Sequence, residues 1–228
     1  MKKFFTVILT IALGLTVAAQ SPQTNVKKDL NRYVGKFSMV GFSSSTFGTE
    51  SKEGIADYLY RNASGGTRIF EGEFVFNDGK GNFVYGQFKN DKQVGVWEWI
   101  NRNDEDFDVT FNDDGVPDGR FHIGLNIHGI FENGKLVSYW YNGKRLWLYG
   151  DLKNGKPTGT WKIRGKDVPN GEAIVVFDNS GEVINAYTQD VTTGDKYGVS
   201  ENICNLPYEM GQRFVRRIKA QCFRSTWK

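Results

Sequence analysis

Two stretches of the sequence share one frame. Residues 85–97 read YGQFKNDKQVGVW and residues 149–161 read YGDLKNGKPTGTW, with seven of the thirteen positions identical and no gap. A third copy, HGIFENGKLVSYW, occupies residues 128–140, so the copies start 43 and 21 residues apart. The longer interval has room for a further unit, which FDVTFNDDGVPDGRF from Phe107 fits with an inserted residue, and FEGEFVFNDGKGNF from Phe70 is an earlier unit. A repeat at fixed spacing indicates a chain built from one supersecondary unit.

Each copy has the composition of a β-hairpin. An aromatic-Gly stretch leads to Asn-Gly or Asn-Asp, and Gly-x-Trp follows on the way back. Asn-Gly is the strongest short hairpin signal, because both central residues of a type I′ turn need positive φ. The sequence therefore predicts a mainly β protein, an antiparallel β-meander of hairpin repeats of about 21–23 residues with a short C-terminal α-helix. The Asn-Gly pairs stand at 133–134, 142–143, 154–155 and 170–171.

Alternation along the repeats predicts which strand faces are covered. In FHIGLNI (residues 121–127), apolar residues at every second position predict one half-buried strand. The segments VWEWI (96–100) and RLWLYGDL (145–152) are nearly continuously apolar or aromatic, which predicts strands covered on both faces.

The repeats divide the chain into four parts. Residues 1–19 have the pattern of a bacterial secretory signal peptide, with Lys2 and Lys3 before an apolar run; a membrane anchor is the alternative, but the run is short for a span. Residues 20–66 form an N-terminal flank with a short helix over Thr24–Tyr33 and strands around ADYLYR. Residues 67–190 form the repeat β domain, and residues 191–228 form a basic helical cap. We expect export to the periplasm or cell surface.

Helical spacing of apolar residues predicts an amphipathic helix over Pro207–Arg224, with arginines on its other side. Two readings of this helix stay open. It packs its Phe214/Ile218 stripe over the end of the sheet, as a solenoid cap does, or it attaches to an anionic membrane surface. The candidate membrane or anion contacts are Arg213, Arg216, Arg217 and Lys219.

Cys204 and Cys222 are the only two cysteines, and both lie in the C-terminal part. An oxidising exported compartment favours a disulfide between them, which would close a loop of about 18 residues and contribute roughly 3 kcal/mol in the chain-entropy model. Two reduced cysteines in the core are the alternative.

A family resemblance accompanies these patterns. FEGEF followed by Asn-Asp-Gly-Lys resembles the opening of a MORN repeat, and the two thirteen-residue copies are similar to the MORN-variant repeats of exported bacterial proteins and of a related antitoxin-annotated family. The resemblance covers residues 67–165 and, more weakly, the chain to 190. It implies a β-meander that advances one hairpin per repeat, with aromatic side chains stacked between hairpins. The family has lipid-binding and scaffold associations, but its His-Gly-x-Gly ending is replaced here by Gly95-x-Trp97 and Gly159-x-Trp161, so no functional residue is carried over.

The sequence predicts no enzyme, cofactor or metal site. Nucleophile, phosphate-loop and zinc motifs are absent, and the acidic segment 101–119 lacks a calcium-loop spacing. Composition leaves a paired-carboxylate site open, but nothing marks one pair among the 26 acids. If one strand contained both His122 and His128, the two side chains would share a face but lie roughly 20 Å apart, too far to bind one metal ion. A turn between them would bring them together.

Aromatic residues are abundant, with 6 Trp, 10 Tyr and 17 Phe. Most are expected in the core, because a thin sheet has few other ways to bury surface. An exposed row would instead form a platform for a protein or glycan partner. The net charge falls from +3 to +1 without Lys2 and Lys3, which argues against nucleic acid. The hypothesis is a non-catalytic exported binding or scaffolding protein, with membrane attachment through the C-terminal helix as the alternative. The candidate binding-face aromatics are Trp97, Trp99, Trp140, Trp147 and Trp161.

Overall fold

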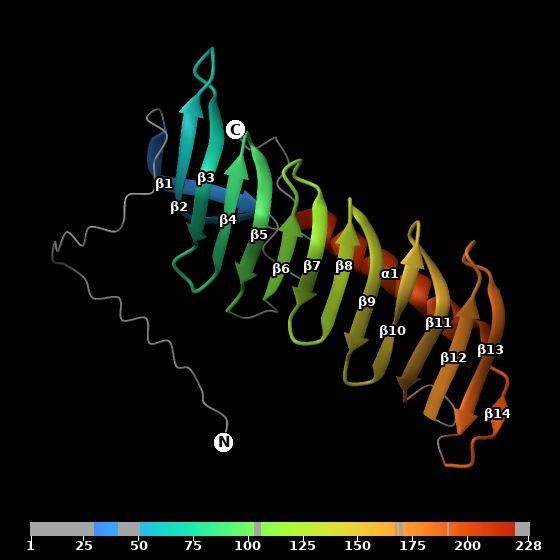
Figure 1. Ribbon diagram of the computed structural model, residues 1–228. Coiled ribbons are helices and arrows are strands. Elements are labelled where there is room, and N and C mark those ends of the chain that lie inside the picture. The colour runs from blue at the N-terminus through green and yellow to red at the C-terminus, as the bar shows by residue number, and fades with distance from the viewer. Residues whose placement is uncertain are drawn as a thin grey trace, which may run out of the picture.

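The computed structural model describes residues 30–40, 51–102, 106–166, 168, 171–190 and 192–221. Within these residues the chain forms one antiparallel sheet of fourteen strands, each paired with the next along the sequence, and one α-helix (Figure 1). This confirms the predicted meander and C-terminal helix. The elements are β1 (Asn31–Val40), β2 (Ser51–Asn62), β3 (Arg68–Asn77), β4 (Phe83–Lys89), β5 (Lys92–Ile100), β6 (Phe107–Phe111), β7 (Pro117–Ile123), β8 (Ile127–Glu132), β9 (Lys135–Asn142), β10 (Leu146–Lys153), β11 (Lys156–Gly165), β12 (Gly171–Phe177), β13 (Val183–Asp190), β14 (Lys196–Tyr197) and α1 (Glu201–Gln221).

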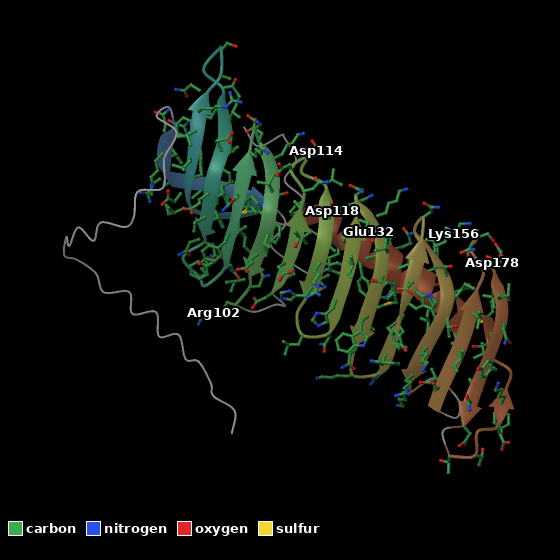
Figure 2. All side chains as sticks on the ribbon, viewed as in Figure 1. Arg102, Asp114, Asp118, Glu132, Lys156 and Asp178 are labelled. Atoms are coloured by element: carbon green, nitrogen blue, oxygen red, sulfur yellow. The ribbon has the colours of Figure 1, made fainter. Side chains whose placement is uncertain are left out.

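The tight turns of the thirteen-residue copies follow the predicted backbone geometry. Both central residues have positive φ in Asn90-Asp91, Asn133-Gly134 and Asn154-Gly155. Asn tolerates this left-handed region better than most residues, and glycine adopts it without a steric clash because it has no Cβ. These turns lie at one end of the strands, where Figure 2 labels Asp114, Asp118, Glu132, Lys156 and Asp178. Arg102 lies at the opposite end of the strands.

The glycine at the second position of the frame and the tryptophan at its last position are in contact. A Cβ added at Gly86 would lie 2.1 Å from the Trp97 ring, and one added at Gly150 would lie 2.4 Å from the Trp161 ring. Each indole therefore packs directly on the backbone of the preceding strand. The Trp97 Nε1 donates a hydrogen bond to the carbonyl oxygen of Gln87 at 3.0 Å. The Trp161 Nε1 donates one to the carbonyl oxygen of Asp151 at 3.1 Å.

The Gly-x-Trp ending has its own backbone role. Gly95 has φ +67° and Gly159 has φ +65°, and the pairing of each strand with its neighbour shifts register at this point. Such an irregularity re-aims the following side chain. As a result Trp97 and Trp161 point to the covered face of the sheet, where both are fully buried.

Two elements cover this inner face. In Figure 1, β1 crosses behind the first strands and α1 crosses behind the later ones. Phe37 of β1 packs edge-on against Phe74 with ring centroids 5.7 Å apart. α1 contacts β9, β10 and β11 through a buried stripe at helical spacing. The stripe consists of Ile203, Pro207, Gly211, Phe214 and Ile218.

The stripe lies close to the sheet because Gly211 has no side chain. A Cβ there would meet Tyr139 at 3.2 Å. The Tyr139 hydroxyl, itself buried, donates a 2.5 Å hydrogen bond to the carbonyl oxygen of Pro207. Burial raises the pKa of Tyr139 far above its ordinary value, because the phenolate would lose its hydration.

Several predicted elements are wrong. FHIGLNI is a hairpin and not one strand: β7 ends at Ile123, Gly124 has φ +56°, and Leu125 is 89% exposed in the turn. A turn that happens to keep apolar alternation imitates a strand. VWEWI and RLWLYGDL have only one covered face, because no described element lies over their other side, and Val96 is 53% exposed.

The boundaries of the two flanks also differ from prediction. Residues 31–33, assigned to a helix, lie in β1, because they pair with β2 from Asn31 opposite Tyr60 onward. α1 begins at Glu201 and not at Pro207, and the Ser200 carbonyl accepts hydrogen bonds from the backbone N–H groups of Ile203 and Cys204. Residues 1–29, which include the predicted signal peptide, and residues 222–228 lie outside the described residues.

Candidate binding face

The uncovered face of the sheet carries one side chain per strand in continuous register. Asp108 of β6 pairs with His122 of β7, and His122 pairs with His128 of β8. The register continues through Trp140 of β9 and Tyr149 of β10 to β11. We call this set the outer row. It consists of Asp108, His122, His128, Trp140, Tyr149 and Lys162.

Planar side chains touch along the centre of the outer row. The His122 and His128 rings are 6.1 Å apart at an interplanar angle of 25°, and the His128 and Trp140 rings are 5.2 Å apart at 29°. Trp147 flanks the row and lies 5.0 Å from the Tyr149 ring in an edge-on arrangement. Three neighbouring strands thus present nearly parallel rings, followed by a second aromatic pair.

Charged side chains hold the ends of the outer row in place. The Asp108 carboxylate contacts the His122 Nδ1 and accepts a hydrogen bond from the His122 backbone N–H at 3.2 Å. At the other end, Arg164 lies 5.1 Å over the Trp147 ring and pairs with Glu172 at 2.6 Å. A cation over an indole face is favourable, so Arg164 fixes Trp147 from one side.

Two surface depressions follow this row and share residues. One of about 430 Å³ extends from Asp108 to Trp140, and one of about 700 Å³ extends from Ser138 to Arg164. Ser138, Tyr139 and Trp140 line both, so the two depressions adjoin at β9 and together extend across β6–β11. We call the combined depression the outer groove. Its floor is aromatic and its margins carry hydrogen-bonding groups such as Arg120, Asp151 and Thr160.

The five predicted binding-face tryptophans separate into two groups. Trp97, Trp99 and Trp161 are 0%, 1% and 0% exposed, so their candidacy as surface residues is wrong and the core interpretation is confirmed for them. Trp140 and Trp147 lie half-buried in the outer groove. Sequence reasoning missed His128 and Tyr149 as members of the face. The available signal was their shared place at the first position of the repeat frame.

The basic side of α1 is exposed, while its apolar side is not. Arg213, Arg216 and Lys219 face solvent, and Arg217 is partly buried. Because the apolar stripe packs on the sheet, insertion of this helix into a membrane would require its release from β9–β11. Within the described residues no helix has the length and apolar character needed to cross a membrane. Contact of the basic residues with a membrane or anion stays a prediction.

Cys204 lies in the first turn of α1, where burial raises the pKa of its thiol. Cys222 lies outside the described residues, so the disulfide stays a prediction. Gln221, the residue before it, is at the other end of the helix, about 26 Å along the axis from Cys204 at 1.5 Å per residue. Disulfide-bonded Cα atoms lie within about 7 Å, so a bridge within one chain would require the last turns of α1 to unwind.

Comparison with known proteins adds no family. No family model matches the chain, and no curated protein matches it. The MORN-variant assignment therefore stays a prediction, although the fold that it implies is the one observed. In the described part of the chain, no group of three or more His, Cys, Asp or Glu side chains is arranged to hold a metal ion.

Proposed function

We propose that the protein is a non-catalytic, exported binding protein of the MORN-variant type, and that its outer groove binds a glycan chain. The observation that carries the proposal is the outer row itself. His128, Trp140 and Tyr149 stand in one register on adjacent strands, uncovered by any described element.

Stacked rings suit sugars because a pyranose has an apolar C–H face that packs on an aromatic ring, while its hydroxyl groups point outward. Tyr and Trp provide large contact area at low conformational cost. Adjacent strands lie about 4.8 Å apart, so aromatic side chains on successive strands recur at a spacing close to the length of one sugar unit. A chain of sugars lying across the strands would therefore meet one platform after another.

The margins of the groove supply the groups that hydroxyls need. Arg120 and Lys162 are donors, Asp151 is an acceptor, and Ser138 and Thr160 are both. The groove crosses six strands and is not an enclosed pocket, which favours a polymer over a small free ligand. A protein partner is the competing interpretation, because Tyr, Trp and Arg are also enriched at protein interfaces.

The repeat provides a matched pair for the test. Tyr149 and Tyr85 occupy the same position of the frame and are 37% and 36% exposed. Tyr149 pairs with Trp140 and lies in the outer groove, whereas Tyr85 pairs with Glu98 and Val75 and lies outside the groove. A binding role therefore predicts different results for the same substitution at the two positions.

Purified protein is screened against immobilised bacterial, plant and fungal polysaccharides, and hits are measured by affinity electrophoresis. We expect Trp140→Ala and Tyr149→Ala each to weaken binding about tenfold, which corresponds to 1.4 kcal/mol. Tyr85→Ala should leave binding unchanged. Equal binding by wild type and the Trp140→Ala/Tyr149→Ala double variant would overturn the proposal, as would a screen with no glycan hit in which a peptide partner binds the same groove.

A second candidate function rests on the exposed Arg213, Arg216 and Lys219. These side chains would attract an anionic surface electrostatically, without insertion of the helix. Co-sedimentation with phosphatidylserine vesicles tests it. Binding should fall as salt rises and disappear in an Arg213→Gln/Arg216→Gln/Lys219→Gln variant; binding that resists salt or survives this variant contradicts it.

A further inference from the structure

The only two histidines of the chain meet on the outer row. A turn at residues 124–126 reverses the chain between them, so His122 of β7 stands directly opposite His128 of β8. The expectation that they lie about 20 Å apart assumed one continuous strand, and it is wrong. Directly opposed residues on paired strands have Cβ atoms about 4.5–5.5 Å apart, within reach of one ligand.

Hydrogen bonds leave one nitrogen of each imidazole with an available lone pair. The His122 Nδ1 faces the Asp108 carboxylate, which assigns the proton to Nδ1 and the lone pair to Nε2. The His128 Nε2 lies 3.3 Å from the Leu125 carbonyl oxygen, an acceptor, which assigns the proton to Nε2 and the lone pair to Nδ1. Metal-binding histidines commonly have this arrangement, in which one ring nitrogen donates to a carboxylate or carbonyl and the other binds the ion.

We propose that His122 and His128 together bind a divalent transition-metal ion of the imidazole-preferring class, Cu²⁺, Ni²⁺ or Zn²⁺, with Asp108 as a positioning residue. Imidazole suits these ions, whereas Mg²⁺ and Ca²⁺ prefer oxygen ligands. Because no group of three or more candidate ligands converges in the described residues, the site has two protein ligands and solvent completes the coordination.

Binding of one ion by both nitrogens sets a distance that the two rings must meet. Bond lengths of about 2.0–2.1 Å place two nitrogens on the same ion roughly 3 Å apart. In the structure the two rings are nearly parallel with centroids 6.1 Å apart, so the proposal requires the imidazoles to rotate about their side-chain torsions until the nitrogens reach that separation. Solvent can supply the ion, because His128 is exposed and the His122 side chain is 40% exposed.

The site lies in the outer groove and shares His128 with the glycan proposal, but it uses the histidines as ligands and not as stacking platforms. It also has a built-in reporter. The His128 ring stacks on Trp140 at 5.2 Å, so a bound paramagnetic Cu²⁺ ion would quench the fluorescence of that tryptophan. Trp140→Phe should remove most of the quenching, because it removes the indole that stacks on His128.

Isothermal titration of protein purified without a histidine tag tests the proposal with Cu²⁺, Ni²⁺ and Zn²⁺, using Mg²⁺ and Ca²⁺ as controls. We expect one ion per chain, at least tenfold weaker binding in His122→Ala and in His128→Ala, and loss of binding in the double variant. Asp108→Ala should weaken binding about tenfold, and Asp108→Asn should weaken it less, because the amide oxygen still accepts the Nδ1 proton.

Two controls separate this site from other sources of binding. A Cys204→Ser/Cys222→Ser variant should bind like wild type, and thermal melting should show that the histidine variants remain folded. Binding retained by the His122→Ala/His128→Ala variant, or absent from the wild type, overturns the proposal. Neither outcome bears on glycan binding, which Tyr149→Ala tests separately.

Discussion

The two most similar copies of the frame have the same interior and different exteriors. In residues 85–97 and in residues 149–161, a glycine lies beneath an indole, the indole nitrogen donates to the strand before it, and a positive-φ glycine precedes the tryptophan by two residues. On the outer face the copies differ, because Tyr85 pairs with Glu98 whereas Tyr149 pairs with Trp140 and Lys162. The repeated residues therefore encode the hairpin, and the unrepeated cross-strand neighbours encode the surface.

Removal of the two indoles should have the largest effect on stability. Trp97→Ala and Trp161→Ala each leave a cavity in a fully buried setting and should lower the free energy of unfolding by about 3–5 kcal/mol. Urea unfolding measures this. Trp140→Ala, on the half-buried outer face, should cost less than either. A much smaller loss in one copy than in the other would show that the two interiors are not equivalent.

The two copies also differ in the aromatic residue that contacts each indole. Phe74 pairs with Gly86 beside Trp97, and Tyr139 pairs with Gly150 beside Trp161. The Tyr139 hydroxyl has a hydrogen-bond partner in α1, the carbonyl oxygen of Pro207. Tyr139→Phe removes the hydrogen bond to Pro207 and should cost about 1 kcal/mol.

The reciprocal change, Phe74→Tyr, should cost more, about 1–3 kcal/mol, because it buries a hydroxyl among aromatic rings. Urea unfolding of both variants gives the order. If Tyr139→Phe is neutral, the short hydrogen bond to α1 contributes nothing to stability, and the difference between the copies is one of shape alone.

A smaller and equal effect is expected at the positive-φ glycines. Gly95 and Gly159 have nothing within 4 Å of an added Cβ, so Gly→Ala introduces backbone strain without a clash. Each substitution should cost about 1 kcal/mol, and Gly→Asn should cost less because Asn tolerates this region better. Unequal losses at the two positions, measured by thermal melting, would indicate that the surroundings of one copy relieve the strain.

The interior was predictable from sequence because it depends on local chemistry. The Asn-led turns, the one-hairpin advance and the burial of Trp97 and Trp161 all follow from residues within one copy. The exterior was not predictable, because it depends on register between copies and on which elements lie over the sheet. Nothing local shows that β1 and α1 cover the same face, and Leu125 keeps the apolar alternation while standing in a turn. The meeting of His122 with His128 was missed for that reason.

The smallest effect concerns a turn outside the copies, between β12 and β13. The turns of the two copies begin with neutral Asn, whereas this one depends on Asp178, whose carboxylate accepts hydrogen bonds from the backbone N–H groups of Ser180 and Glu182 at 2.7 and 2.9 Å. The bond from Glu182 is the main reason that the pKa of Asp178 lies below its usual value of 3.8.

Because this pKa is lowered in the folded state, the carboxylate stabilises the fold above about pH 4. That contribution is lost as the pH falls through the lowered value. Asp178→Asn keeps a neutral acceptor, as Asn112 provides between β6 and β7. The melting temperature of the variant should therefore be slightly below wild type at pH 7, and the two should converge near pH 2. A gap that is constant from pH 7 to pH 2 would show that the charge of Asp178 plays no part and that this turn behaves like the Asn-led turns of the copies.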